Sequence, residues 1–365
     1  MIIQAKSAVI AGAIVGDTWV EISENLIRSV NKGVNPFPDQ IIDGVLIPGF
    51  VDIHCHGGGG KYFSALTPGE IHSVIETHRG HGTTSLMASL VSEPIETMKE
   101  QITRLKPFYV RGQIVGIHLE GPYLSHARCG AHDPALLVAP DLTEIKELIE
   151  LADGAIKMIT IAPELPGAIV AIKYLSAAGV TVAIGHTDGA FIDAAAGTNA
   201  GATVVTHFMN GMNKSLTEGS FASFVVADDR LAVELILDGH HIAFSTAREI
   251  YTALGSRIIF VTDAMAAAGS TDGEYTIGKL AVTVKDGVAR LESNAALAGS
   301  VLTMDAVFIN AVDSLGLSVK EAVAATSTRA AKRLGFKDRG DIAVGMRADL
   351  LSYNASTSSV TLISE

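Results

Sequence analysis

The sequence predicts an α/β protein, a (β/α)8 TIM-like barrel with a small β-sandwich domain built from both chain ends. Eight apolar runs rich in Val, Ile and Thr recur along the chain, helix-like stretches separate them, and short β-like runs occupy both ends. Nearly continuous apolar character is typical of parallel strands that are buried on both faces. We therefore expect a β domain over 1–47 plus 337–365, and a barrel over 48–336.

The first 47 residues predict the N-terminal part of the β domain. Turns are expected at Gly16-Asp17 and at 31–33, where the residue types favour tight reversals. The run 8–16 follows Lys6 and could imitate a short signal sequence, but it lacks a clear small-residue cleavage site, so a β-hairpin is the better interpretation. The expected strands are 1–4, 8–15, 18–22 and 26–30.

The barrel elements follow after Pro48-Gly49. The eight expected strands are 45–56, 83–89, 115–122, 155–163, 181–188, 203–210, 232–239 and 258–265. The expected helices between them are 68–81, 142–151, 167–178, 191–200 and 242–254, and several end at a capping glycine. A doubly wound sheet is the structural alternative, but no glycine-rich phosphate turn follows the first strand.

Beyond the eighth strand the pattern returns to β structure. Residues 275–291 predict a β-hairpin that turns at Asp286-Gly287, and 303–315 and 319–334 predict two helices. The tail, 340–364, contains short β-like runs, which we expect to join the N-terminal strands.

The composition excludes several classes of protein. Among 365 residues, 48% are apolar and 18% are charged, which suits a large buried core. The net charge of −12 argues against binding to nucleic acid or to anionic membranes, because both need a basic surface. No run approaches the roughly 18 to 20 apolar residues of a membrane span. Two cysteines fit a reducing compartment, so we expect a cytoplasmic location.

Polar residues gather where the predicted strands end, which is where barrel enzymes carry their chemistry. His54 and His56 are two apart on a strand, so both side chains point to the same face. His118 and Glu120 have the same spacing. Eight of the twelve histidines lie at or just beyond such ends: His54, His56, His118, His132, His186, His207, His240 and His241.

Imidazole and carboxylate together are the ligands that Zn²⁺, Fe²⁺ and similar divalent ions prefer. A single histidine at a strand end is usually a hydrogen-bonded structural residue, but several aimed at one barrel mouth would be costly to bury without a metal. For His118 the structural interpretation is preferred, as a partner that supports Glu120. Asp263 ends the eighth strand; it could cap the next turn, but opposite a metal-bound water it suits a general base and later a general acid.

The chain resembles the N-acetylglucosamine-6-phosphate deacetylases of the amidohydrolase superfamily along essentially its whole length. The segment 48–60 (PGFVDIHCHGGGG) is similar to the first-strand signature of the superfamily, and the segment 118–124 (HLEGPYL) narrows the resemblance from the superfamily to the deacetylases. The other matching segments are 185–188 (GHTD), 206–212 (THFMNGM), 238–241 (DGHH), 261–265 (VTDAM), 297–300 (LAGS) and 345–350 (GMRADL).

The resemblance implies roles for the barrel-mouth residues. Glu120, His186 and His207 would bind one metal, and His54 and His56 a second, with Glu120 as a candidate bridge. Some family members replace the first-strand histidines and hold one metal, so one or two ions are expected, zinc first, with iron, cobalt, manganese or cadmium as alternatives.

The resemblance also implies a substrate and its contacts. An amino-sugar phosphate would be hydrolysed to the free amine and acetate, with Asp263 moving the proton and His132 polarising the carbonyl. A homodimer is expected from the family alone. The implied substrate-binding residues are Ala131, Asn210, Gly211, His241 and Lys214.

One departure concerns the substrate phosphate. The family has an arginine after the sixth-strand motif, whereas 214–220 here reads KSLTEGS. A lysine meets a phosphate only as a point charge, so Lys214, aided by His241 or Lys61, would be a weaker substitute. The alternatives are weak phosphate binding, another N-acetylhexosamine, or a substrate without phosphate.

Three further alternatives remain open. Relatives that hydrolyse cyclic amides carry a carboxylated lysine at the end of the fourth strand, but here that strand ends in Ala162-Pro163-Glu164. A catalytically inactive scaffold on the same fold is a different class, which the retained ligands and Asp263 disfavour. Cys129 lies in the loop before His132, and it is either an inert thiol or a lid residue whose alkylation slows the enzyme. Cys55 is expected in the core.

Overall fold

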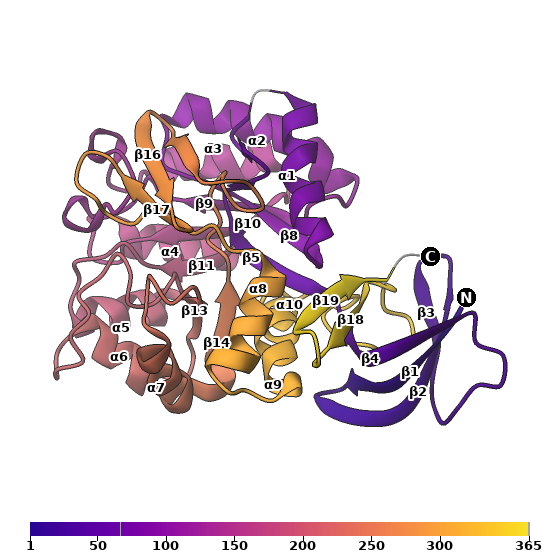
Figure 1. Cartoon of the computed structure of the whole chain (residues 1–365). Coiled ribbons are helices and arrows are strands. Elements are labelled where there is room, and N and C mark those ends of the chain that lie inside the picture. The colour runs from indigo at the N-terminus through magenta and orange to yellow at the C-terminus, as the bar shows by residue number, and fades with distance from the viewer. Residues whose placement is uncertain (66, 364–365) are drawn as a thin grey trace. The chain divides into compact units, whose positions relative to one another are not determined.

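An eight-stranded parallel sheet organises the central part of the chain and confirms the predicted fold class (Figure 1). The computed structural model describes residues 1–65 and 67–363. The order of the sheet is β14-β13-β12-β11-β10-β9-β8-β5, so strands that follow one another in sequence lie side by side. The strands are β5 (Phe50–Cys55), β8 (Thr83–Leu90), β9 (Gly116–Glu120), β10 (Ile156–Ile161), β11 (Thr181–Ile184), β12 (Val204–Val205), β13 (Ala232–Ile236) and β14 (Ile258–Val261).

The first and last strands of this sheet meet and close it. The amide of His56 donates to the carbonyl of Ala264 at 2.9 Å, and the amide of Asp263 donates to the carbonyl of His54 at 2.8 Å. A parallel bridge joins Cys55 to Ala264. Closure brings the carboxyl ends of β5 and β14 together, and with them the polar residues that follow each strand.

Helices connect the parallel strands, and two of them were not predicted. The two missed helices are α2, which contains Pro107, and α6, which has only seven residues. An interior proline and a short length each weaken the helical pattern in a sequence. Among the described residues, no helix combines the length and apolar character that crossing a membrane requires. The helices are α1 (Pro68–Gly80), α2 (Ile95–Val110), α3 (Leu142–Ala152), α4 (Ala168–Ala177), α5 (Phe191–Ala200), α6 (Phe221–Ala227) and α7 (Phe244–Leu254).

Both chain ends build one mixed sheet of six strands. Its order is β19-β18-β4-β1-β2-β3, and β18 pairs with β4 in antiparallel register. The amide of Ile27 donates to the carbonyl of Met346, which brings the segment before β18 back against β3 and encloses an aliphatic core. The strands are β1 (Ile2–Ile10), β2 (Ala13–Ser23), β3 (Leu26–Lys32), β4 (Gln40–Pro48), β18 (Leu350–Asn354) and β19 (Ser359–Leu362).

Two expectations for the first 56 residues were wrong. The first reversal lies at Ala11-Gly12, where both φ angles are positive, as a tight hairpin turn requires, and Gly16 instead pairs with Ser7 inside β2. The run 45–56 is two strands, because β4 pairs with β1 and β18 whereas β5 belongs to the barrel sheet. Gly49 separates them at a close approach, where a Cβ atom would lie 2.1 Å from Thr84 Oγ1.

The segment after β14 forms a small sheet of three strands, one more than the predicted hairpin. The strands β15 (Gly273–Ile277), β16 (Leu280–Lys285) and β17 (Val288–Leu291) pair in antiparallel order. Asp286-Gly287 forms the second turn, as predicted, and both residues have positive φ. A two-stranded hairpin, β6 (Gly57–Gly58) with β7 (Lys61–Tyr62), follows β5.

The helices after this sheet are α8 (Met304–Ile309), α9 (Val319–Val323) and α10 (Arg329–Arg333), with π-helical turns at Asn310–Ser314 and Ala324–Thr328.

The chain packs as two compact units. One comprises Met1–Asp52, His78–Ser85 and the residues from Thr303 onward, and the other comprises Ile53–Thr77 and Leu86–Leu302. The expected boundaries of the β domain, 1–47 plus 337–365, stay a prediction.

Candidate metal centre and active site

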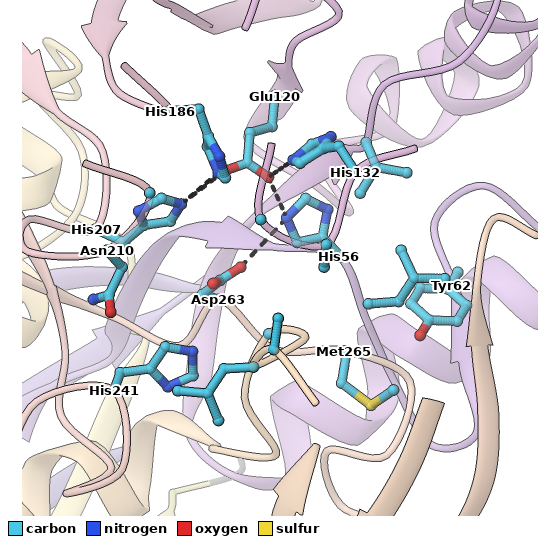
Figure 2. Close-up of a pocket in the computed structure, with 18 of the residues that line it drawn as sticks. His56, Tyr62, Glu120, His132, His186, His207, Asn210, His241, Asp263 and Met265 are labelled. Atoms are coloured by element: carbon cyan, nitrogen blue, oxygen red, sulfur yellow. Dashed lines mark hydrogen bonds and ion pairs between the residues drawn. The ribbon is translucent and has the colours of Figure 1, made fainter. Parts of the chain in front are cut away.

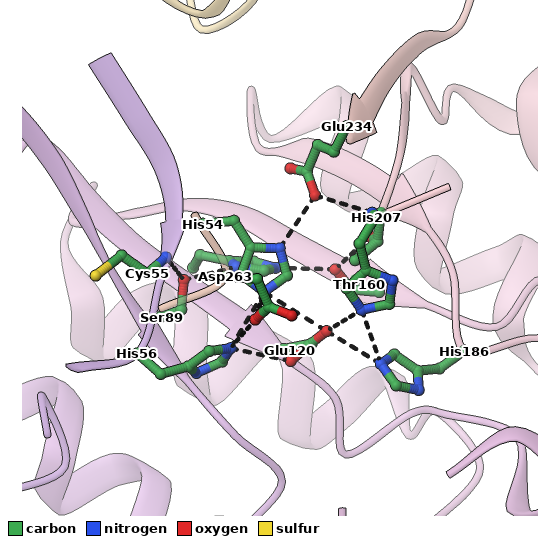
Figure 3. Close-up of polar contacts among 12 residues, drawn as sticks. His54, Cys55, His56, Ser89, Glu120, Thr160, His186, His207, Glu234 and Asp263 are labelled. Atoms are coloured by element: carbon green, nitrogen blue, oxygen red, sulfur yellow. Dashed lines mark hydrogen bonds and ion pairs between the residues drawn. The ribbon is translucent and has the colours of Figure 1, made fainter. Parts of the chain in front are cut away.

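Seven buried polar side chains meet at the carboxyl ends of the barrel strands (Figure 2, Figure 3). Each comes from the end of a strand or from the segment that follows it, because the barrel topology directs these ends to one mouth. All seven are at most 8% exposed. They are His54, His56, Glu120, His132, His186, His207 and Asp263.

Glu120 is the common partner of this group. Its Oε1 lies 3.0 Å from Nε2 of His207 and 3.1 Å from Nε2 of His186. Its Oε2 lies 3.2 Å from Nε2 of His56 and 3.3 Å from Nε2 of His132. One carboxylate therefore contacts four imidazoles, with a different pair at each oxygen, and Nε2 of His54 lies slightly farther away, at 3.6 Å from Oε1.

The ligand atoms fall into two sets of three that share Glu120. One set is Glu120, His186 and His207, and the other is His54, His56 and Glu120. Asp263 lies beside the second set, with Oδ1 at 3.4 Å from Nε2 of both His54 and His56.

The chemistry of these atoms fits a divalent cation. Nδ1 of His186 lies 2.8 Å from the carbonyl of Arg128, which can only accept, so this nitrogen carries the hydrogen. A neutral His186 then presents a bare lone pair on Nε2, which faces Nε2 of His207 at 3.0 Å. Nitrogen lone pairs and a carboxylate at such spacing are the donor set of Zn²⁺ or Fe²⁺. The two sets could hold one ion each.

The electrostatics keep the central carboxylates ionised. Burial opposes the charge of Glu120, but His54 and the hydrogen bonds from the other imidazoles outweigh it, so the pKa of the Glu120 carboxyl is well below its usual range. The pKa of Asp263 is also lowered, because His54 and His56 outweigh the cost of its burial. Both residues are therefore in the form that binds a cation or accepts a proton.

His132 is held as a hydrogen-bond donor to the pocket. Burial lowers its pKa, which favours the neutral ring. Nε2 of His132 lies 3.3 Å from Oε2 of Glu120, a carboxylate that can only accept, so the ring hydrogen lies on Nε2, and Nδ1 accepts from the amide of Ser92 at 3.3 Å. That hydrogen points to Oε2 of Glu120.

Three of the site residues have a backbone conformation that side chains rarely adopt. The φ angles are 46° for His186, 24° for His207 and 47° for Asp263. Such conformations cost on the order of 1–3 kcal/mol each and persist only when the surroundings hold them. Hydrogen bonds to neighbouring segments do so here, for example from the amide of Ser300 to the carbonyl of Asp263 at 2.8 Å. The strain turns these side chains into the mouth.

A cavity of about 260 Å³ opens beside this group. The structure brings all of the predicted substrate-binding residues to its wall: Ala131, Asn210, Gly211, Lys214 and His241. His241 is fixed by Asp238, whose Oδ2 lies 2.6 Å from Nδ1 of the ring, so Nε2 is left for a ligand. Lys61 instead forms an ion pair with Glu70 at 2.9 Å.

One sequence prediction for a neighbouring residue, His118, needs revision. His118 does not hydrogen-bond Glu120; its ring nitrogens contact Ser89 and Thr160, at 3.0 and 2.8 Å, and its ring packs edge-on against His54. Burial keeps the pKa of His118 well below its usual range, which suits these neutral partners. Cys55 is buried as predicted, and Cys129 is half-buried.

Sequence reasoning missed two residues that orient the others. Ser92 sets the tautomer of His132, and no motif marks it. Glu234 is fully buried in β13 and contacts His54 and the amide of His207 (Figure 3). A single glutamate in the otherwise apolar strand Ala232–Ile236 was the available signal, since an isolated buried acid needs a partner.

Comparison with known proteins identifies relatives along nearly the whole chain. The model of the amidohydrolase family matches residues 45–361. An N-acetylgalactosamine-6-phosphate deacetylase from Escherichia coli O157:H7 is 30% identical over 348 residues, covering 93% of this chain and 91% of that protein. An N-acetylglucosamine-6-phosphate deacetylase from Lysinibacillus sphaericus is 33% identical over 310 residues, covering 83% and 80%.

A solved structure is similar over the full length. A mutant of N-acetyl-D-glucosamine-6-phosphate deacetylase from Mycobacterium smegmatis, in complex with N-acetyl-D-glucosamine-6-phosphate, matches with a TM-score of 0.96 and 38% identity. The match covers 100% of this chain and 97% of that chain. The relatives thus include deacetylases of two epimeric amino-sugar phosphates.

Proposed function

The chain belongs to the amidohydrolase family, and from this we propose that it hydrolyses the N-acetyl group of N-acetylglucosamine 6-phosphate to glucosamine 6-phosphate and acetate, in amino-sugar catabolism. The observation that carries the proposal is the Glu120, His186 and His207 set, which lines one cavity together with Asp263 and His132. The similarity to the Mycobacterium smegmatis deacetylase, which was solved with this substrate, supports the choice of sugar.

The proposal includes one or two divalent ions, with zinc preferred and iron, cobalt, manganese and cadmium as alternatives. Glu120, His186 and His207 would hold one ion, and His54, His56 and Glu120 a second. A divalent ion bound there would lower the pKa of a water molecule and polarise the acyl carbonyl.

The chain's own residues then move the proton and stabilise the oxyanion. Asp263 is ionised and accepts the proton of the attacking water, and it later returns a proton to the amine nitrogen that leaves. The Nε2 hydrogen of His132 donates to the carbonyl oxygen as negative charge develops on it. Both groups are buried, which strengthens their electrostatic effect.

The far wall of the cavity would bind the sugar. Asn210, Gly211 and Ala131 line the cavity and would contact the ring and the acetamide, and His241 and Lys214, which also line it, would contact the 6-phosphate. Because the expected arginine is absent, the phosphate is held by one ammonium group and one imidazole.

A second candidate is deacetylation of another N-acetylhexosamine or its 6-phosphate. The similarity to an N-acetylgalactosamine-6-phosphate deacetylase favours it, as does the missing arginine. A scaffold without activity is disfavoured, because the buried imidazoles, Glu120 and Asp263 are all present.

The test is acetate release by metal-supplemented protein on four substrates. They are N-acetylglucosamine and N-acetylgalactosamine, each with and without the 6-phosphate. We expect the highest kcat/KM for N-acetylglucosamine 6-phosphate. A higher value for the galactosamine epimer would establish the second candidate, equal values with and without phosphate would remove the phosphate from the proposal, and no acetate from any of the four would contradict a deacetylase.

Lys214→Met isolates the role of the lysine in phosphate binding. We expect KM to rise about 10-fold, equivalent to about 1.4 kcal/mol, for the phosphorylated sugar and to stay unchanged for the sugar alone. An equal change for both sugars would show that Lys214 does not read the phosphate.

We also propose a homodimer in the cytoplasm. Exposed apolar side chains on α5, α6 and the segment between them support a dimer: Phe191, Ile192, Leu216 and Val226. Sedimentation of the purified protein tests the dimer.

A further inference from the structure

Glu234 occupies an unusual position beneath the candidate metal centre. It is 0% exposed and lies in β13, whose other residues, Ala232, Val233, Leu235 and Ile236, are all apolar and buried. A carboxylate in such a strand is costly unless its oxygens have partners. One oxygen has two partners, and both belong to candidate metal ligands.

The first partner is the imidazole of His54. Oε2 of Glu234 lies 3.0 Å from Nδ1 of His54 (Figure 3). A carboxylate can only accept, so this contact places the ring hydrogen on Nδ1 and leaves Nε2 to face His56, Glu120 and Asp263. Partners of this kind fix the tautomer and the ring orientation of metal-binding histidines and raise their basicity.

The second partner is the backbone of His207. The same Oε2 accepts from the amide of His207 at 3.2 Å, and the carbonyl of Glu234 accepts from the amide of Phe208 at 2.8 Å. These bonds hold the backbone where the φ angle of His207 is 24°. Glu234 thus contacts one member of each ligand set, through the side chain of His54 but only through the backbone of His207.

The other carboxylate oxygen indicates that Glu234 does not serve mainly to stabilise the fold. Oε1 is buried and has no hydrogen-bond partner among the described residues. A half-satisfied buried carboxylate costs desolvation free energy, and Glu234→Gln removes that charge while keeping an acceptor for His54 and the amide of His207, so it should not lower the stability. The arrangement is therefore explained by what Glu234 does to His54.

We infer that Glu234 is a positioning residue that orients His54 for a second divalent ion and so determines whether the His54, His56 and Glu120 set is occupied. The inference rests on the proposed metal dependence. Without the Glu234 charge, the hydrogen bond to Nδ1 weakens and His54 loses part of its basicity, whereas the Glu120, His186 and His207 set keeps all of its side-chain contacts.

The experiment is a zinc titration of metal-free full-length protein, with bound zinc per chain measured by mass spectrometry and affinities by calorimetry. We expect two ions for the wild type. Glu234→Gln keeps an acceptor oxygen but removes the charge, and should weaken one of the two ions about 10- to 100-fold while leaving the other within about threefold. The metal-free variant should melt at or above the wild-type Tm.

Two further variants assign the effect. Asp305→Asn is the matched control, because Asp305 holds Nδ1 of His81 at 2.8 Å in the same way but in the other compact unit; it should bind two ions normally. His54→Asn should bind one ion, and adding Glu234→Gln to it should not change the affinity of that ion.

Four results would overturn the inference: a wild type that binds one ion, a Glu234→Gln variant that binds both with wild-type affinity, an equal loss in the His54→Asn background, or a metal-free Tm that falls together with the affinity. Acetate release is measured separately on the wild type. If zinc-loaded protein binds two ions but releases no acetate, the proposed function fails while the role of Glu234 stands.

Discussion

The barrel mouth and the six-stranded sheet bury side chains of opposite kinds. The sheet encloses fully buried aliphatic residues such as Ile3, Ile27 and Leu46. The mouth buries His54, Glu120 and His207 to a similar degree. Burying an aliphatic side chain stabilises by about 1.5–3 kcal/mol, whereas burying imidazoles and carboxylates costs free energy unless each finds a partner. The sheet therefore supplies stability, and the mouth depends on what it binds.

The largest effect is expected from Asp263→Asn in the mouth. The amide cannot accept the proton of water, so kcat should fall about 10²- to 10⁴-fold, and bound metal and Tm should stay near the wild-type values. Steady-state acetate release with metal analysis measures this. Turnover within about threefold of the wild type would remove Asp263 from the mechanism.

Removing the divalent metal should destabilise the unit that contains the mouth. An ion at about 1,000 times its Kd stabilises the folded state by about 4 kcal/mol, and a chelator removes that contribution. Calorimetry with chelator and with added zinc gives the shift in Tm. Identical melting curves would show that the imidazoles and carboxylates of the mouth need no ion.

Leu46→Ala tests the contribution of the aliphatic core of the six-stranded sheet to stability. Leu46 is 0% exposed, and its truncation should lower the free energy of unfolding by about 2–5 kcal/mol through lost burial and a cavity. Denaturant unfolding measures the loss. The kcat of the folded fraction should not change, and a fall in kcat would contradict the separation of stability from catalysis.

The smallest effect concerns the ion pair of His81 and Asp305 in the unit that contains the sheet. The hydrogen bond to Asp305 raises the pKa of His81, and hydrogen bonds from His81 and Thr303 outweigh burial and lower the pKa of Asp305. The stability that His81 contributes is fully present below its pKa in the unfolded chain, and it is lost as the pH rises through its raised pKa in the folded protein. The aspartate contribution is present above its unfolded pKa and is lost as pH falls through the lowered value.

The pair should therefore stabilise most between about pH 4 and pH 6.5. His81 is substantially exposed, so solvent screening limits the contribution to less than about 1 kcal/mol. His81→Asn should lower Tm slightly at pH 5.5 and less at pH 9. A Tm difference that is the same at both values would show that charge is not involved.

Most of the candidate site could be located from the sequence because a buried parallel strand has a recognisable residue pattern. Apolar runs mark the buried strands, and the first polar residues after them mark the mouth. This placed Glu120, His186 and Asp263 together without coordinates, since the barrel topology directs strand ends to one side. Spacing in the strand was enough to put His54 and His56 on one face.

Local patterns were less informative where pairing partners decide the structure. The first hairpin turn and the division of 45–56 into β4 and β5 depend on which strands lie alongside, and a run of apolar residues is the same in either case. Helix α2 was missed although it is sixteen residues long. Its interior proline is accommodated in the last turns, which propensity does not reveal.

Residue identity along the chain thus decides the fold class, the candidate metal ligands and the candidate acid–base residue, because periodicity and side-chain chemistry are local properties. The tertiary structure decides which carboxylate serves which imidazole, the tautomers of His54 and His132, and the position of Glu234 behind the ligands. These depend on distances between residues far apart in sequence, 180 positions in the case of His54 and Glu234. Hydrogen bonds act over about 3 Å, so only the packed barrel specifies them.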